Sequence, residues 1–407
     1  MDTFRPYYIL PITGTVQDAM TTKLMFVDDE PDVESLMRMK FRRQLRENTF
    51  DLVFAKSGQE ALTKLEENPD ICLVLSDINM PEMDGLTLLQ RIIELKNPLL
   101  KTVVVSAYGD MGNIRTAMNR GAFDFVTKPI DFTDLEATIT KTLSQVETTR
   151  RAIEEHDQLV SVRRDLSLAT RIQQSIVPRV FPPFPGRTEF DIYAEMITAK
   201  EVGGDFYDFF LLDDDHLGFV VGDVSGKGVP AAIFMAMSRT LLKATAAQVR
   251  DAGECLKRVN DLLIPENKAS MFVTIFYGIL NTKTGELTFC NGGHNPPGRI
   301  RAGGETDLLP LTGGPFVGAI PGLSFETGTM TLSPGDTLFV YTDGVTEATD
   351  PDAALFGDDR MLDSLKTNGR ESLDHLVKSM LDGIDGFVRG APQADDITML
   401  ALRFNGS

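Results

Sequence analysis

The first third of the chain alternates short apolar runs with longer amphipathic stretches. The apolar runs cover residues 24–27, 52–55, 72–76, 102–106 and 124–127. Between them lie stretches of helical length, such as 31–46 and 86–96. Strands that alternate with helices in this way predict a parallel, doubly wound α/β sheet.

A different pattern follows, because residues 134–177 contain neither Gly nor Pro. Val146, Ile153 and Val160 recur every seven residues, and a second apolar series that begins at Leu159 steps by three and four. The offset between the two series resembles a stutter, and charged residues weaken the seam. We predict a long signalling helix that forms a conditional coiled coil and a homodimer. The alternative is one long solvated helix without a dimer.

The remainder of the chain predicts an α+β layered sandwich. Strands are expected at 218–221, 272–280, 287–291, 336–341 and 397–402, with a hairpin turn at Thr284-Gly285. Helices are expected at 231–249, 255–263 and 370–389. The predicted divisions are a flexible extension at 1–22, an α/β domain at 23–143, a helical linker at 144–183 and the sandwich at 184–407. Met20 offers an alternative natural start.

Composition narrows the functional classes for these 407 residues. A formal net charge of -19 argues against nucleic acid or an anionic membrane as the main partner. The cysteines Cys72, Cys255 and Cys290 stand singly in apolar surroundings, which predicts reduced core residues and a cytoplasmic protein. No apolar run approaches the roughly 18 residues of a membrane span. The run at 7–12 is also too short for a signal peptide.

Polar side chains mark the carboxyl ends of the strands in the α/β domain. They are Asp28, Asp29, Asp77, Ser106 and Lys128. Three crowded carboxylates repel one another, which implies a hard cation such as Mg2+. An Asp oriented by that ion can attack a phosphoryl donor and form an acyl phosphate. Lys128 would pair with one phosphoryl oxygen and Ser106 would hydrogen-bond another. Helix capping explains one Asp at a strand end, but not five matched groups.

Residues 23–143 resemble the receiver domain of two-component response regulators. The resemblance rests on the Asp28-Asp29 pair, on Asp77 within the motif at 76–85, on Ser106 and on Lys128-Pro129. It implies a flavodoxin-like fold with Asp77 as phosphoacceptor and a histidine kinase as phosphodonor. It also implies a Mg2+ site formed by Asp28, Asp29, Asp77 and the Asn79 carbonyl, a cis Lys128-Pro129 peptide, and Phe125 at the aromatic switch position.

Acidic residues beside tight turns recur in the sandwich domain. They are Asp205, Asp223, Asp343 and the Asp395-Asp396 pair. A single Asp at a turn is usually a turn former. Four such corners, in a domain whose histidines are His216, His294 and His375, indicate an all-oxygen metal site. Two Mg2+ or Mn2+ ions about 4 Å apart can clamp a phosphate and activate water. The pattern therefore predicts phosphate ester hydrolysis without a protein nucleophile.

The stretch Gly203-Gly204-Asp205-Phe206 also suggests the Gly-Gly-Asp/Glu-Glu-Phe turn of a diguanylate cyclase. That enzyme needs Glu where Phe206 stands. Asp223, Asp343 and Asp395 would also have no role in it. The cyclase reading is therefore disfavoured, because a motif without its context is weak.

From about residue 166 onward the chain resembles the metal-dependent PPM serine/threonine phosphatases, in their SpoIIE/RsbU-like branch. The matching motifs lie at 169–178, 203–208, 222–228, 291–297, 342–347, 356–357 and 394–398, with Gly292 where Ala is usual. The resemblance implies a four-layer sandwich in which Asp223 bridges two metal ions. The Val224 carbonyl would bind one ion, Asp343 and Asp395 would complete one shell, and Asp205 would serve the other ion. Asp208 and Asp396 would support the ligands without touching the ions.

The resemblance also implies a substrate class, namely phosphoserine or phosphothreonine on an anti-sigma-factor antagonist in a partner-switching pathway. We hypothesise that phosphorylation of Asp77 repacks the helix at 134–177 and orders the phosphatase site, although inhibition is the opposite possibility. The main alternative is a non-catalytic adaptor whose phosphorylated receiver controls protein binding.

Overall fold

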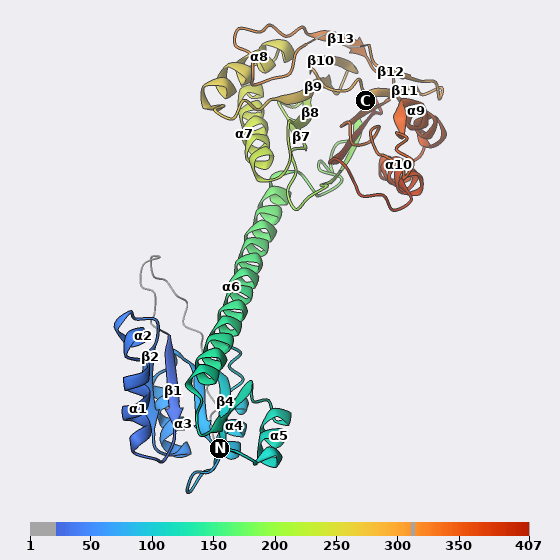
Figure 1. Cartoon of the computed structure of the whole chain (residues 1–407). Coiled ribbons are helices and arrows are strands. Elements are labelled where there is room, and N and C mark those ends of the chain that lie inside the picture. The colour runs from blue at the N-terminus through green and yellow to red at the C-terminus, as the bar shows by residue number, and fades with distance from the viewer. Residues whose placement is uncertain (1–21, 311–313, 407) are drawn as a thin grey trace. The chain divides into compact units, whose positions relative to one another are not determined.

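The computed structural model describes residues 22–310 and 314–406. The chain forms two compact units that divide between Ser161 and Val162, inside helix α6 (Phe132–Ile176), and Figure 1 shows each unit with its elements labelled. The predicted flexible extension at 1–22 lies outside the described residues except for Thr22.

The first unit is built on a parallel sheet with the strand order β2-β1-β3-β4-β5. Its strands are β1 Lys23–Val27, β2 Asp51–Ala55, β3 Ile71–Asp77, β4 Lys101–Ala107 and β5 Asp124–Lys128. Its helices are α1 Asp32–Lys40, α2 Arg42–Arg46, α3 Gly58–Glu67, α4 Gly85–Glu94 and α5 Met111–Asn119. The predicted doubly wound fold is confirmed. The strand order reverses at β1 and β3, where ligands bind in such sheets.

The stretch of helical length at 31–46 is helical, but the structure divides it at Phe41 into α1 and α2. The Phe41 ring is buried and meets the Phe50 ring edge-on at a centroid distance of 5.5 Å. The backbone leaves helical geometry at this residue, with φ -93° and ψ 16°. The bend therefore coincides with an aromatic side chain that packs into the core.

Helix α6 is 45 residues long, so the long linker helix is confirmed. Its first turns bury Leu135, Ile139 and Val146 in the core of the first unit. Farther along, Leu159 and Val160 are 58% and 51% exposed. These apolar side chains are not covered within the described chain, so coiled-coil pairing stays a prediction.

The second unit contains two antiparallel sheets, each covered by helices on its outer face. One sheet has the order β13-β10-β9-β8-β7 and the other β12-β11-β14-β15-β6. The strands of the first are β7 Phe206–Leu211, β8 His216–Val224, β9 Val273–Asn281, β10 Glu286–Gly292 and β13 Gly328–Thr331. Those of the second are β6 Phe190–Ile197, β11 Gly298–Ile300, β12 Thr306–Leu308, β14 Thr337–Tyr341 and β15 Ile397–Phe404.

Helices α7 (Val229–Ala246) and α8 (Ala252–Leu263) pack on the first sheet, and a short 3-10 helix, η1, follows at Ile264–Glu266. Helices α9 (Gly357–Asn368) and α10 (Leu373–Val388) pack on the second sheet. The result is the four-layer order helix, sheet, sheet, helix. The hairpin at Gly285 is also confirmed, with φ +76°.

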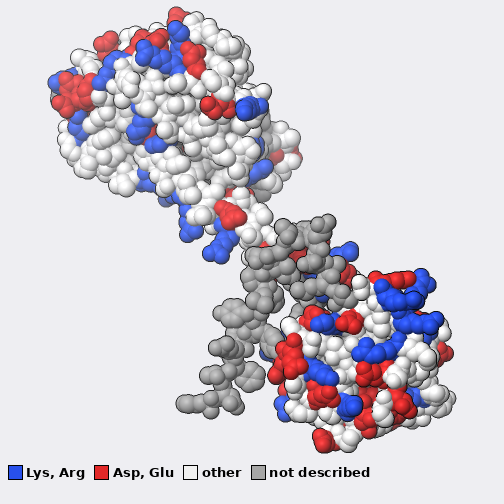
Figure 2. Space-filling model, turned by 90° about the vertical axis from the view of Figure 1, so that its left-hand side faces the viewer, with Lys and Arg blue, Asp and Glu red and all other residues white. Residues whose placement is uncertain are grey.

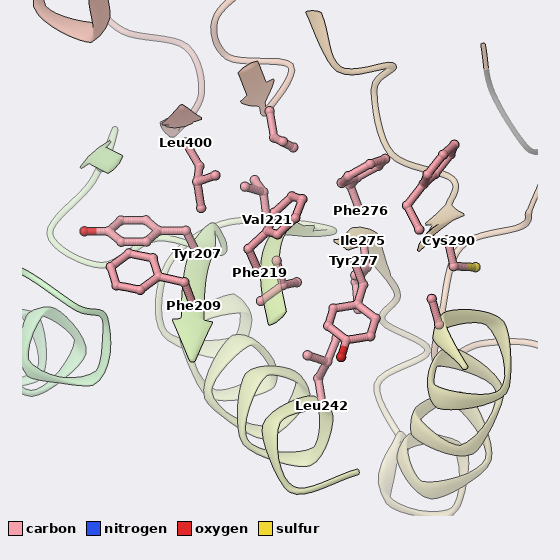
Figure 3. Close-up of a cluster of buried hydrophobic side chains, with 14 of the residues drawn as sticks. Tyr207, Phe209, Phe219, Val221, Leu242, Ile275, Phe276, Tyr277, Cys290 and Leu400 are labelled. Carbon is pink, nitrogen blue, oxygen red and sulfur yellow. The ribbon is translucent and has the colours of Figure 1, made fainter. Parts of the chain in front are cut away.

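The main core lies on both faces of the β7–β10 sheet. Figure 3 shows Leu400 of β15 approaching one face and Leu242 of α7 approaching the other. Between them, Phe219 and Tyr277 are fully buried. Two helices and a second sheet enclose these strands, and the acidic residues Asp205 and Asp223 lie at their ends.

The surface charges and the hydropathy of the helices can be compared with what the composition predicts. On the face that Figure 2 shows, acidic and basic side chains are interspersed on both units. Among residues 22–310 and 314–406, no helix combines the length and the apolar content that a membrane-crossing helix needs.

Candidate phosphoacceptor and metal-binding sites

The first candidate site lies at the carboxyl ends of β1 and β3. Asp28, Asp29 and Asp77 each place a carboxylate oxygen within 4.8 Å of the others. Lys128, at the end of β5, places its Nζ 2.6 Å from Asp77 Oδ2 and 3.0 Å from Asp28 Oδ2. The Lys128-Pro129 peptide is cis, as predicted.

The negative charge at this site exceeds the positive charge, which favours a bound cation. Burial raises the pKa of Asp28, although hydrogen bonds from the Glu30 N–H and from Lys128 oppose the rise. Burial lowers the pKa of Lys128, but its bonds to Asp77 and Asp28 outweigh burial and the pKa ends above its usual value. Lys128 is therefore charged at neutral pH. Three carboxylates around one ammonium remain short of positive charge, and the oxygen donors suit Mg2+.

Two further predicted residues adjoin Asp77. The Ser106 hydroxyl on β4 is buried and has no hydrogen-bond partner among the described residues. An orphaned hydroxyl there fits the predicted contact with a phosphoryl oxygen. The Asn79 N–H donates to Asp77 Oδ1 at 3.2 Å. Phe125, the predicted switch residue, is half-buried on β5.

The second candidate site gathers acidic residues from the ends of four strands. Asp205 directly precedes β7, Asp223 lies near the end of β8, Asp343 follows β14 and Asp395 precedes β15. The Asp205 and Asp223 carboxylates lie within hydrogen-bond reach of each other. Asp343 and Asp395 are close enough to repel one another. Asp223 also lies close enough to Asp343 and Asp395 for their charges to repel it. Among the described residues, these acids do not offer three oxygens within 4.8 Å of one another, as the receiver acids do.

These carboxylates are short of counter-charge. Burial, with repulsion from Asp343 and Asp395, raises the pKa of Asp223 to about 7. Burial, with repulsion from Glu347 and Asp395, raises the pKa of Asp343 to about 6. Burial and the Asp223 charge also raise the pKa of Asp205 well above its ordinary value. Buried acids in this state require protons or cations. An all-oxygen donor set fits Mg2+ or Mn2+.

The loop that carries Asp205 is fixed by Asp396. The Asp396 carboxylate accepts the N–H groups of Ala199 at 2.8 Å and Gly204 at 2.7 Å. A Cβ at position 203 would lie 2.1 Å from Asp396 Oδ2, and one at position 204 would lie 2.8 Å from the Val224 carbonyl oxygen. The Gly203-Gly204 pair is therefore needed because the backbone passes between these two oxygens.

Helix α6 also contacts this loop. The Gln173 side chain, which is buried, donates to the Gly203 carbonyl at 2.7 Å and accepts the Gly203 N–H at 3.1 Å. The Thr170 hydroxyl donates to the Glu201 carbonyl at 2.6 Å. The last turns of the linker helix thus hold the backbone that precedes Asp205.

Asp208 lies in a different environment from the four acids. Its fully buried carboxylate is 2.7 Å from Arg239 and 3.2 Å from Lys243, both on α7. Asp208 therefore ties β7 to α7. Its predicted support of the metal ligands remains a proposal.

Three residues that sequence reasoning left without a role adjoin the acids. Lys227 Nζ is 2.9 Å from Asp395 Oδ2, and the Thr342 hydroxyl donates to Asp205 Oδ2 at 2.7 Å. His294 is buried, which lowers its pKa to about 4 and keeps it neutral. Its Nδ1 lies 2.9 Å from the Thr274 hydroxyl, which in turn donates to the Asp223 carbonyl at 3.4 Å. All three residues lie in or next to the phosphatase-like sequence motifs, and this position is the signal that could have identified them.

Comparison with known families divides the chain as the fold does. Residues 24–140 match the response regulator receiver domain, and residues 213–405 match the stage II sporulation protein E (SpoIIE) family.

Individual relatives cover different shares of the chain. Protein IcfG of Synechocystis is 33% identical over 273 residues, which cover 60% of this chain and 42% of IcfG. The phosphoserine phosphatase RsbU of Bacillus subtilis is 25% identical over 62% of this chain and 75% of RsbU. Chemotaxis protein CheY of Listeria monocytogenes is 40% identical over 26% of this chain and 86% of CheY. The chain thus spans less than half the length of IcfG.

The solved SiaA-PP2C domain of Pseudomonas aeruginosa superposes with a TM-score of 0.53 at 22% identity, and it covers 61% of this chain and 98% of that domain. This likeness establishes the fold. The two units therefore define a receiver joined by a long helix to a PP2C-type fold. The chain belongs to the response regulator receiver family, and its second unit matches the SpoIIE family model and has the PP2C-type fold.

Proposed function

We propose that this protein is a response regulator whose output is metal-dependent hydrolysis of phosphoserine or phosphothreonine on another protein. The main support is the group of acids at the strand ends of the second unit, where the raised pKa values of Asp205, Asp223 and Asp343 mark a site short of cations. The similarity to RsbU, a phosphoserine phosphatase, supports the same reaction.

Each acidic residue has a proposed role. Asp223 would bridge two ions, and the Val224 carbonyl would bind one of them. Asp343 and Asp395 would complete the shell of one ion, and Asp205 would serve the other. When bound, two Mg2+ or Mn2+ ions would clamp the phosphate and supply an activated water. Within this chain, the hydroxyl of Thr342 and the N–H bonds to Asp396 hold Asp205 and its loop in position.

The receiver has a separate proposed chemistry. Asp77 would accept a phosphoryl group from a histidine kinase, and Asp28, Asp29, Asp77 and the Asn79 carbonyl would hold Mg2+. Lys128 and Ser106 then bind the phosphoryl oxygens, and Phe125 responds as the switch residue. The short distance from Lys128 to Asp77 and the orphaned Ser106 hydroxyl support this assignment.

We further propose that the substrate is a phosphorylated anti-sigma-factor antagonist and that the protein is a homodimer paired through α6. The exposed apolar positions on α6, such as Leu159, support pairing.

The test measures phosphate release from a phosphoserine protein with Mn2+. We expect Asp343→Asn to lose at least about a hundredfold in rate, because metal clamping contributes several kcal/mol to the transition state. Asp352→Asn is the matched control, since the Asp352 side chain is 82% exposed and its carboxylate pairs with Arg389 on the surface. Full activity in Asp343→Asn would refute the metal mechanism. A wild-type chain that is inactive but binds partners on Asp77 phosphorylation would instead be an adaptor.

A further inference from the structure

Lys227 lies in the loop between β8 and α7, beside the proposed metal ligands. Its Nζ is 2.9 Å from Asp395 Oδ2 and also donates to the Ala394 carbonyl. Among the ion pairs that the described residues form with one another, this pair alone involves one of the four acids Asp205, Asp223, Asp343 and Asp395. Its ammonium therefore sits where a cation that binds Asp395 would have to sit.

The loop leaves this side chain room to move. Lys227 is flanked by Gly226 at φ +86° and Gly228 at φ +81°, and a Cβ at either glycine would meet nothing within 4 Å. The Lys227 side chain itself is 38% exposed. A lysine on a flexible stem in an open loop can exchange one anionic partner for another without rearranging the fold.

We propose that Lys227 is a tethered counter-ion that occupies the Asp395 carboxylate until a divalent ion displaces it, and that the released ammonium then binds a phosphoryl oxygen of the substrate. This role rests on the proposed phosphatase function and adds the residue that recognises the phosphate. A dication on Asp395 would repel the ammonium, whereas an incoming phosphate dianion would attract it.

The position of the loop favours an anion next to Lys227. Gly228 is the N-cap of α7, and among the described residues no side chain caps the first N–H groups of this 18-residue helix. Helix N-termini carry partial positive charge and unpaired N–H donors, which favour phosphate oxygens. An ammonium and a helix N-terminus would then converge on the same anion.

A purely structural role predicts the opposite effect on metal binding. If Lys227 only fastened its loop to Asp395, its removal would loosen the site and weaken metal binding. If Lys227 competes with the metal, its removal tightens metal binding, because a repulsive positive charge is lost. The direction of the change therefore separates the two roles.

The experiment uses full-length protein and measures Mn2+ dissociation constants from the EPR signal of free Mn2+. We expect Lys227→Met to bind Mn2+ about tenfold more tightly at the phosphatase site than wild type. Lys227→Arg keeps the charge and should stay close to wild type. The receiver site contributes equally in every variant, and Asp395→Asn identifies the phosphatase contribution. Thermal melts confirm that each variant folds.

The second measurement titrates inorganic phosphate in saturating Mn2+. We expect Lys227→Met to bind phosphate about tenfold more weakly, since a charge-assisted hydrogen bond is lost. Unchanged or weaker Mn2+ binding in Lys227→Met would overturn the counter-ion role, and unchanged phosphate binding would overturn the recognition role. If Asp395→Asn binds Mn2+ as wild type does, the proposed metal site itself fails.

Discussion

The half-buried acids Asp223 and Asp343 make stability depend on pH with an unusual sign. Their pKa values lie at about 7 and about 6, above the ordinary 3.8, because burial and mutual repulsion disfavour the charged form. Between pH ~4 and pH ~7 the folded protein therefore keeps protons on these two carboxyls that the unfolded chain releases. By linkage, the contribution of these groups to stability is full below pH ~4 and is lost as pH rises through about 7.

With a chelator present, we predict that the melting temperature of the second unit decreases as the pH is raised from 5 to 8. Ordinary carboxyls are already ionised above pH ~5 and contribute little to that slope. With Mn2+ present, stabilisation by the metal should instead grow with pH, because the ligands must be deprotonated. Calorimetry across this range measures both slopes.

Asp223→Asn is the control for this prediction, since the amide cannot titrate. The slope in chelator should become shallower in that variant. A wild-type melting temperature that rises with pH in chelator would contradict the assignment of raised pKa values.

At the scale of single residues, the sequence predicts chemical type but not long-range contacts. The acids were identifiable because each stands beside a turn at the end of an apolar run. Lys227 was not, because its contact with Ala394 joins residues 167 positions apart. The bond from the Ala199 N–H to Asp396 likewise spans 197 positions. A local pattern reports the chemistry of a residue but not which distant residue it will meet.

At the scale of elements, α7 is attached to β7 by an ion triad in which Asp208 is paired with Arg239 and with the exposed Lys243. Asp208 is fully buried, and Arg239 is only 14% exposed. Removing one member of a buried ion pair leaves the other without a partner, which is strongly destabilising. The triad therefore fixes the strand that begins immediately after Asp205.

We predict that Asp208→Ala lowers the free energy of unfolding of the phosphatase unit by about 3–5 kcal/mol. Chemical denaturation followed by circular dichroism measures the change. Asp352→Ala removes an exposed partner of Arg389 and should leave the unfolding midpoint nearly unchanged. Equal midpoints for Asp208→Ala and wild type would show that the triad does not stabilise the fold.

Elements with strong periodicity were predictable, and weakly patterned ones were not. Helix α9 escaped prediction because Met361 and Leu365 are its buried residues among many charged ones. The strands β11 and β12 have three residues each, too few to show alternation. The division of the first helix depends on the burial of Phe41, a tertiary contact. The local hydrophobic pattern therefore predicts the layers of the fold but not every helix and strand in them.

At the scale of the whole molecule, α6 is continuous between two sites of different chemistry. It starts with side chains buried in the receiver core, such as Leu135 and Ile139. It ends with Gln173, whose two hydrogen bonds hold Gly203 in the loop before Asp205. A rotation or shift of the helix would therefore act on the position of one proposed metal ligand.

We predict that phosphorylation of Asp77 by acetyl phosphate raises the rate of phosphoserine hydrolysis and that Asp77→Ala removes the response. Gln173→Ala should remove the response as well, while Asp77 still becomes phosphorylated, because the helix would lose its hydrogen bonds to the Asp205 loop. Gln145→Ala is the matched control, since Gln145 is exposed on the same helix. Steady-state rates and phosphorylation stoichiometry are measured on the same samples. A full response in Gln173→Ala would show that the signal reaches the metal site by another route. Equal rates for phosphorylated wild type and Asp77→Ala would contradict control by phosphorylation without contradicting the proposed phosphatase activity.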